Sequence, residues 1–143
     1  MSSLCPWVFL LALPLAVLWF FLRTKRNRRR FAAGRTPMSD DAYLQANQVP
    51  LERAWIVLAV RKAVALQCRV PPEMIHGDES QGYVNHYLFF DGFDPVLFML
   101  YLEEQTGGRI ADEPLAQLPL FSGSDALRIW IAETADVLWR RLE

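Results

Sequence analysis

The residues that could carry chemistry are few, and their spacing matches no recognised catalytic or metal-binding pattern. The two histidines are His76 and His86, and neither stands beside a cysteine or an acid at a spacing typical of zinc ligands. Asp91 and Asp94 flank Gly92, a pattern that favours a turn followed by a helix N-cap over a metal site. We therefore expect the histidines to lie at the surface or to pin a loop, and to bind no metal.

Glu103 and Glu104 could in principle act as a general acid and a general base. Neighbouring residues on a helix point about 100° apart, however, so the two carboxylates are poorly placed to reach one substrate atom. Gly107 and Gly108 lack the rest of any phosphate-binding pattern. No nucleophile is paired with a base along the chain, although a triad assembled from scattered residues stays open. The sequence predicts a protein that is not an enzyme and uses no cofactor.

The N-terminal segment predicts a membrane anchor. Residues 4–22 (LCPWVFLLALPLAVLWFFL) contain no charge, and as a helix they are long enough to cross about 30 Å of hydrocarbon. Trp7 and Trp19 fit the preference of aromatic residues for the two membrane interfaces, and Pro14 should kink the helix. No basic residue precedes the run and no small-residue cleavage site follows it, so we expect residues 1–22 to form an uncleaved transmembrane helix.

A cluster of positive charges, the basic collar, follows the apolar run directly. It consists of Arg23, Lys25, Arg26, Arg28, Arg29 and Arg30. By the positive-inside rule, this collar places the C-terminal domain of a single-pass membrane protein in the cytoplasm. The collar could also bind anionic membrane lipid, at roughly 1 kcal/mol per well-placed charge, or it could set the topology and nothing more.

The stretch after the collar predicts a tether. Residues 31–47 have no sustained apolar period and contain Gly34 and Pro37, and a short helix around residues 40–46 is an option. We expect residues 23–48 to form the collar and tether, and residues 49–143 to form the folded domain.

Charge is strongly segregated along the chain. All sixteen acids lie from Asp40 onward, where eight bases accompany them, so this part carries a formal charge of about −8. Such a surface repels nucleic acid and favours a protein partner with a basic surface. The alternative is that the acids only keep a small domain soluble.

Helical periodicity begins the domain. Residues 51–68 predict a first helix that Pro50 can open and that the prolines at 71 and 72 end. Its expected core face comprises Trp55, Leu58, Ala59, Ala63 and Leu66. A long connection over residues 72–93 follows, and a loop of this length in a small domain needs a reason.

A second helix is predicted over residues 95–106. Asp94 is placed to cap its N-terminus, and Gly107 is placed to end it. The segment is apolar on nearly every side before Glu103, so we expect this helix to be the central element of the core.

The C-terminal part predicts one short helical turn over residues 112–118 and a final helix over residues 125–143. The apolar face of the final helix comprises Leu127, Trp130, Ile131, Thr134 and Leu138. No strand pattern competes with these helices. The sequence thus predicts an all-α domain of three main helices and one short helix behind the anchor.

Two stretches of this domain resemble the acyl carrier protein family. Residues 70–75 (VPPEMI) are similar to the stretch that begins the family's long loop, and residues 102–113 (LEEQTGGRIADE) to the stretch that ends its second helix. The resemblance covers residues 51–143 and implies the family's small helical bundle. In the family a serine before the second helix carries the phosphopantetheine arm, and here that position is Gly92, which has no hydroxyl.

The resemblance implies a membrane-anchored adaptor or complex subunit that keeps a carrier protein's recognition surface without its prosthetic group. In the family, acids on and near the second helix meet basic patches of partner proteins. The matching residues in this chain are Asp94, Glu103, Glu104, Asp112 and Glu113. One alternative is a functional acyl or peptidyl carrier modified at another serine, for which Ser80 is the candidate, and another is an unrecognised enzyme.

Overall fold

The chain is helical throughout the part that the structure describes. The computed structural model describes residues 5–88, 93–107, 117–119, 121 and 125–142, with the side chains of residues 5–11, 86, 87 and 142 left out. In these ranges the only β-type pairing is an isolated bridge between Ser80 and Ala126. The prediction of an all-α chain is confirmed for these residues.

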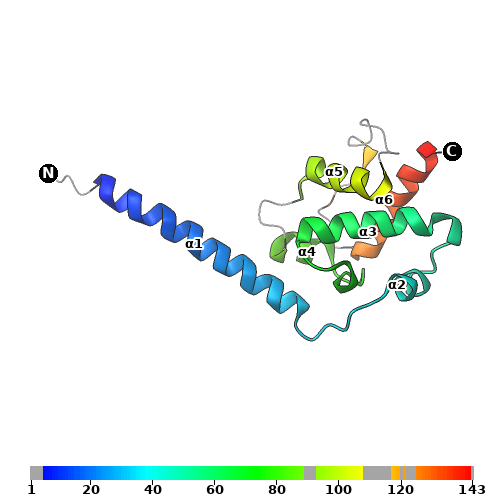
Figure 1. Ribbon diagram of the computed structural model, residues 1–143, viewed down its shortest axis with the longest axis horizontal. Coiled ribbons are helices and arrows are strands. Elements are labelled where there is room, and N and C mark those ends of the chain that lie inside the picture. Colours follow the sequence, from blue (N-terminus) through cyan, green and yellow to red (C-terminus); the bar gives the residue numbers. More distant parts are fainter. Residues whose placement is uncertain (1–4, 89–92, 108–116, 120, 122–124, 143) are drawn as a thin grey trace.

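Figure 1 shows a long helix that projects from a compact bundle. The projecting helix is α1 (Cys5–Ala32), and the bundle is built from α3 (Ala54–Cys68), α5 (Pro95–Thr106) and α6 (Leu127–Leu142). The helix α3 packs against both α5 and α6. The two short helices, α2 (Asp40–Ala46) and α4 (Gln81–Tyr87), lie in the connecting segments.

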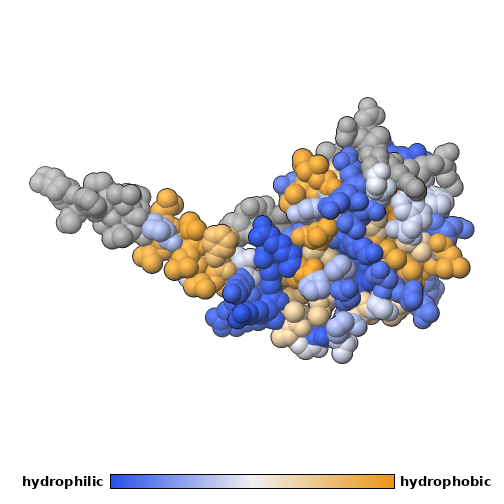
Figure 2. All heavy atoms as spheres, in the orientation of Figure 1, coloured by the Kyte–Doolittle hydropathy of each residue, from blue (hydrophilic) through white to orange (hydrophobic). Residues whose placement is uncertain are grey.

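The helix α1 joins the apolar run and the basic collar without a break. No glycine or proline lies between Pro14 and Gly34, and arginine and lysine are good helix formers, so the helix continues through the collar. Gly34 then adopts a left-handed conformation, with a φ of +80°, just after the helix has ended. Figure 2 shows hydrophobic residues along the middle of α1 and hydrophilic residues where the helix approaches the bundle.

The predicted membrane span is only partly covered by the structure. Leu4 and the side chains of residues 5–11 lie outside the described part of the chain. In the described part of the chain, no helix combines the length and the apolar character needed to cross a membrane.

The helix α3 is the central element of the bundle. It begins at Ala54, after a 3-10 turn η1 (Leu51–Arg53), so the first helix is predicted almost to its bounds. Its buried residues are Ile56, Val57, Ala59, Val60, Arg61, Ala63, Val64, Ala65 and Cys68. The predicted core face is wrong at its edges, because Trp55 and Leu66 are 38% and 40% exposed. With neighbours on two sides, α3 buries a broader surface than a single amphipathic stripe provides.

The helix α5 has the predicted bounds but not the predicted position. Asp94 caps it, and Gly107 follows in a left-handed conformation, with a φ of +66°. However, Val96 and Leu100 are exposed, so α5 is not covered on every side; it packs against α3, and its Phe98 contacts Trp130 of α6. The expectation that this helix is the central element is wrong, because an all-round apolar sequence does not show which neighbours are available to cover it.

The helix α6 carries the predicted apolar face and begins two residues later than predicted, at Leu127. Leu127, Trp130, Ile131, Thr134 and Leu138 are all buried. The ring of Trp130 packs edge-on against Phe93, Phe98 and Phe121, with centroids 4.9 to 5.4 Å apart. Its indole N–H donates to the carbonyl of Pro119 at 2.9 Å, which satisfies the one polar atom of this aromatic cluster.

The predicted tether and the predicted long connection pack against the bundle. Phe31 and Tyr43 are 2% and 1% exposed, so both ends of the tether are anchored in the core. The connection contains a 3-10 turn η2 (Pro72–Met74) and the helix α4. The helix α2 has the bounds of the short helix that the sequence offered as an option, whereas α4 was not predicted, because the segment around it shows no regular apolar period.

Candidate functional site

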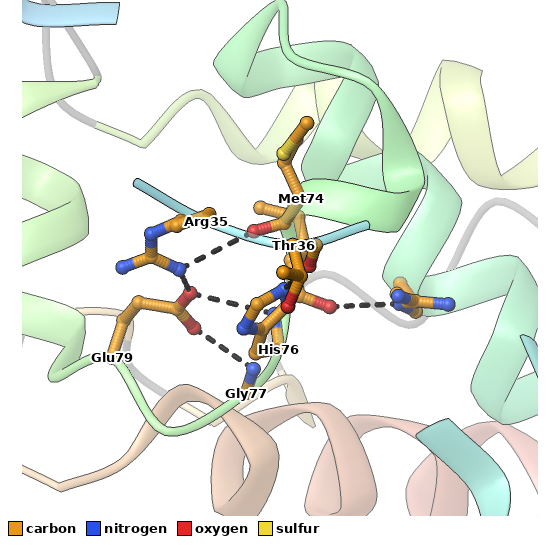
Figure 3. A network of polar contacts seen from close by, with 8 residues as sticks. Arg35, Thr36, Met74, His76, Gly77 and Glu79 are labelled. Atoms are coloured by element: carbon orange, nitrogen blue, oxygen red, sulfur yellow. Dashed lines mark hydrogen bonds and ion pairs between the residues drawn. The ribbon is translucent and has the colours of Figure 1, made fainter. Parts of the chain in front are cut away.

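A buried polar cluster joins the segment after α1 to the loop before α4 (Figure 3). Glu79 lies at its centre, and its side chain is almost completely buried. Its Oε1 accepts hydrogen bonds from Nη1 of Arg35 and from the backbone N–H of His76, and its Oε2 accepts one from the N–H of Gly77 at 2.8 Å. Arg35 also donates to the carbonyl of Met74 at 3.3 Å. Two segments that are distant in sequence are thereby tied together.

These contacts give Glu79 and His76 structural roles. Donors occupy both oxygens of Glu79, so neither oxygen is directed at a substrate. The ring Nε2 of His76 bonds the carbonyl of Thr36 at 2.9 Å, which assigns the ring proton to Nε2. His76 therefore pins the loop, as predicted, whereas the side chain of His86 lies outside the described part. Among described residues, no group of three or more His, Cys, Asp or Glu is arranged to hold a metal ion.

A second cluster surrounds Arg61, which is fully buried in the middle of α3. Its Nε and Nη2 each donate at 2.9 Å to a carbonyl, of Ile75 and Met38 respectively, and its Nη1 donates to Oδ1 of Asp40 at 2.8 Å. The guanidinium also lies over the ring of Tyr43, 4.3 Å from its centroid. Burial lowers the pKa of Arg61, and the charge of Asp40 opposes that shift. The buried charge is therefore both paired and hydrogen-bonded.

Burial also dominates the titration of Tyr43 and Cys68. Desolvation raises the pKa of Tyr43 to about 12 and raises the pKa of the Cys68 thiol well above its usual value. Cys68 is a free, buried cysteine. Because the thiolate is the reactive form, this cysteine is chemically inert and belongs to the core.

The predicted partner-binding acids of α5 lie at its two ends. Asp94 is the N-cap, and its Oδ1 accepts hydrogen bonds from the N–H groups of Val96 and Leu97 at 3.0 Å each. Glu103 and Glu104 lie in the last turn, where Glu104 is exposed and Glu103 is half-buried. The rise of the helix separates Asp94 from Glu103 by about 14 Å. The structure therefore brings Glu103 and Glu104 together and leaves Asp94 apart.

Between these acids, α5 exposes apolar side chains. Val96 and Leu100 are 58% and 56% exposed. Residues spaced by four share one side of a helix, so Val96, Leu100 and Glu104 are aligned, with Glu103 beside them. We call these four residues the α5 face. Its apolar part was not predicted, because an all-round apolar sequence indicates a helix that is covered on every side.

Three predicted site residues lie outside the described residues. They are Gly92, Asp112 and Glu113, and the helical turn expected over residues 112–118 is described only at 117 and 118. Their position relative to the α5 face stays a prediction.

The basic collar presents two different surfaces of α1. Four exposed cations line an open hollow of about 530 Å³ together with Leu22 and Ala33; they are Lys25, Arg26, Arg29 and Arg30. The guanidinium of Arg23 lies 5.2 Å from the ring centroid of Trp19. Arg28 is half-buried, and its pKa is lowered, first by burial and then by the nearby charge of Arg69. Arg28 is thus the collar residue that approaches the bundle.

The residues of the two buried clusters were not identified from the sequence. Arg35, Asp40 and Glu79 carry no local pattern, because their partners are distant along the chain. The signal that could have found one cluster is Arg61, which interrupts the apolar run of the first helix. A charge at such a position needs a buried partner.

Comparison with known proteins adds no relative. No protein-family model matches the chain, and searches of curated proteins and of solved structures found no match to it.

Proposed function

We propose that the chain is a single-pass membrane protein whose cytoplasmic α-helical domain is a non-catalytic interaction module. It acts as an adaptor or complex subunit and resembles an acyl carrier protein without the serine that holds the prosthetic group. The observation that supports this proposal is the α5 face, where two exposed apolar side chains are followed along the helix by two acids. Its partner is a protein with a basic surface.

The α5 face has the composition of a recognition surface. Scattered exposed apolar residues are normal, but Val96 and Leu100 are consecutive members of one helix stripe. Apolar contacts supply binding free energy, whereas the charges of Glu103 and Glu104 favour a basic partner and speed the encounter. This arrangement matches the role that the carrier-protein resemblance implies for these two acids. Asp94 contributes less, because its carboxylate caps the helix.

The proposal also includes the anchor. The apolar run over residues 4–22 is long enough to span the hydrocarbon core, and the collar that follows it favours a cytoplasmic domain. The continuity of α1 through the collar supports this arrangement, because the same helix leads from the apolar run to the domain. Extraction of membranes at alkaline pH should leave the full chain in the membrane pellet, and protease added outside intact cells should spare the domain.

Ser80 bears on the alternative that the chain is a carrier. Its Oγ accepts a hydrogen bond from the N–H of Tyr83 at 3.1 Å and caps α4. The residue is half-buried and forms a bridge with Ala126. A serine in these contacts is a poor attachment point for a mobile arm, and this favours the adaptor. Incubation with a phosphopantetheinyl transferase and coenzyme A should therefore add no mass to the protein, and a gain of one phosphopantetheine would establish the carrier instead.

The interaction itself can be tested by photo-crosslinking in cells. A photoreactive residue at Leu100 should capture a protein partner, whereas the same residue at Leu51, which is 91% exposed and lies outside the α5 face, should not. Crosslinking at both positions alike would show that the α5 face has no special role.

Charge reversal tests the acids. Glu103→Lys with Glu104→Lys should reduce crosslinking from position 100, and the reduction should be larger at low salt because the Debye length is about 10 Å at 0.1 M. Glu52→Lys with Glu133→Lys, two exposed acids outside the α5 face, is the matched control and should change little. Equal effects of the two double variants would mean that the acids act only through net charge.

A further inference from the structure

Unmatched positive charge lies along one exposed side of α1. Beyond Leu22, the open hollow on this side is lined by five exposed residues, which we call the collar stripe: Lys25, Arg26, Arg29, Arg30 and Ala33. Figure 2 shows hydrophilic residues in this part of α1, where the helix approaches the bundle. None of the ion pairs found among the described residues involves a cation of the stripe. The stripe is therefore a basic surface that the described part of the chain does not neutralise.

The α5 face has the opposite charge and the same length. Val96 and Glu104 are eight residues apart, as are Lys25 and Ala33, and eight residues correspond to about 12 Å of helix. Among the described residues, neither Glu103 nor Glu104 forms an ion pair. Each surface thus offers the charge that the other needs.

The two surfaces match when their helices run antiparallel. Val96 then lies against Ala33, and the methylene stem of Arg29 can cover Leu100 while its charged end stays in water. The two acids at the end of the α5 face meet the first two cations of the collar stripe. The negative C-terminal end of the α5 dipole also lies beside those cations, which is its favourable position. The opposite, parallel direction would place the apolar start of the α5 face against cations.

The fold keeps the two surfaces of one chain apart. Phe31 is 2% exposed, and its ring lies 6.2 Å from the ring of Tyr83, so the end of α1 is fixed against α4. The ion pair of Arg35 with Glu79 holds the next residues of the chain in place. The helix α5 packs against α3 instead, and no hydrogen bond or ion pair between described residues joins it to α1. The complementary surface is therefore available only on another copy.

We propose that this protein associates with itself head to tail, with the collar stripe of one copy bound to the α5 face of a second copy. The inference rests on the proposed function and names the partner of the α5 face. The stripe begins just beyond the apolar run, so the contact forms at the membrane surface, where anchoring raises the effective concentration of the copies. Because the contact joins two different surfaces, it can repeat along a row or close into a reciprocal pair.

The test uses two tagged forms of the full chain that are expressed together and extracted in a neutral detergent. One tag is captured, and the amount of the other tag that co-purifies is measured. The face variant is Glu103→Lys with Glu104→Lys, and the collar variant is Lys25→Glu with Arg26→Glu. Two copies of the same variant should co-purify about tenfold less than two native copies, because repulsion replaces attraction at every contact. Undiminished co-purification would overturn the proposal.

Mixing the two variants gives the most specific result. The face variant keeps a native collar, and the collar variant keeps a native α5 face, so one productive contact remains between them. Co-purification of this mixed pair should recover to within about twofold of the native level. A single chain with all four reversals should also associate with itself again. Without recovery in either case, the loss would have another cause and the proposal would fall.

Matched controls exclude net charge and misfolding. Glu52→Lys with Glu133→Lys, and Arg128→Glu with Arg141→Glu, change exposed residues outside both surfaces by the same charge and should co-purify like the native chain. Lysine is favourable in the last turn of α5, so the face variant is expected to fold. Four cations of the collar remain in the collar variant, which should keep its orientation in the membrane. Equal losses in the controls would overturn the proposal in favour of net charge.

The photoreactive residue at Leu100 separates this inference from the proposed function. We expect an adduct with the mass of two chains, crosslinked within residues 22–33 of the second copy. Capture of a different protein and no second copy would keep the proposed interaction module and overturn self-association. Capture of lipid alone would show that the α5 face lies on the membrane, and it would contradict both proposals.

Discussion

Gly77 is the position where a single methyl group should be most informative. Its φ is +90°, and a Cβ placed there would lie 2.9 Å from Cβ of Arg128 on α6 and 3.3 Å from the ring of Tyr43. Gly34 provides the matched control, because its φ is +80° but nothing lies within 4 Å of the added atom. Both alanine variants meet the backbone strain of a positive φ, which costs about 1 to 2 kcal/mol. Only in Gly77→Ala does the added Cβ also clash with a neighbouring side chain.

The expected loss of stability depends on which atom the added methyl group would contact. The Cβ of Arg128 is fixed to the backbone of α6 and cannot move aside as the end of a flexible side chain would. Overpacking of this kind costs about 1 to 3 kcal/mol. We therefore expect Gly77→Ala to lower the free energy of unfolding by about 2 to 5 kcal/mol, and Gly34→Ala by about 1 to 2 kcal/mol.

Urea unfolding of the full chain in mild detergent measures this difference. The fluorescence of Trp130, which is buried in the aromatic cluster, should report the loss of the bundle. The midpoint should shift without a change in m, because neither variant alters the surface that unfolding exposes. Equal losses for Gly77→Ala and Gly34→Ala would refute the steric argument and would mean that the loop before α4 is not pressed against α6.

Three further predictions concern polar groups. Burial raises the pKa of Tyr43 to about 12, from about 10 in the unfolded chain. The protonated phenol therefore stabilises the folded state fully below pH 10, and this stabilisation is lost as the pH rises to 12. Over this range the free energy of unfolding should fall less for Tyr43→Phe than for the native chain, by roughly 2 to 3 kcal/mol. Arg61→Lys should lower the free energy of unfolding by about 2 to 4 kcal/mol in the same urea assay, because the buried carbonyls of Ile75 and Met38 lose their donors. Lys62→Ala breaks only a partly exposed ion pair with Asp40 and should cost less than about 1 kcal/mol. Asp94→Ala should cost about 1 kcal/mol and lower helicity by circular dichroism through loss of the N-cap.

Most of the helix features that were predicted correctly depend on residues that lie close together in the sequence. The pair of Asp94 and Gly107 determines the bounds of α5, since one supplies a side-chain acceptor and the other tolerates a left-handed backbone. The apolar period of α6 predicts its buried face correctly. These features depend on residues within a few positions of each other, so a sequence displays them directly.

The candidate site was predictable only where it depended on residue type. Glu103 and Glu104 were singled out because they match acids of the acyl carrier protein family, and the collar because its cluster of charges is visible in the sequence. The apolar half of the α5 face could not be identified, since Val96 and Leu100 look like core residues. Their exposure depends on which elements cover α5, and the sequence of α5 contains no information on its neighbours.

The helical class, the segregation of charge and the approximate ends of the main helices follow from the sequence, because each depends on neighbours along the chain. Which charges are paired follows only from the packing of distant segments. Glu79 pairs with Arg35 and Arg61 pairs with Asp40 across long stretches of chain. The physical reason is that the free energy of a buried charge is set by whatever the fold places within a few ångströms, and sequence distance does not measure that proximity.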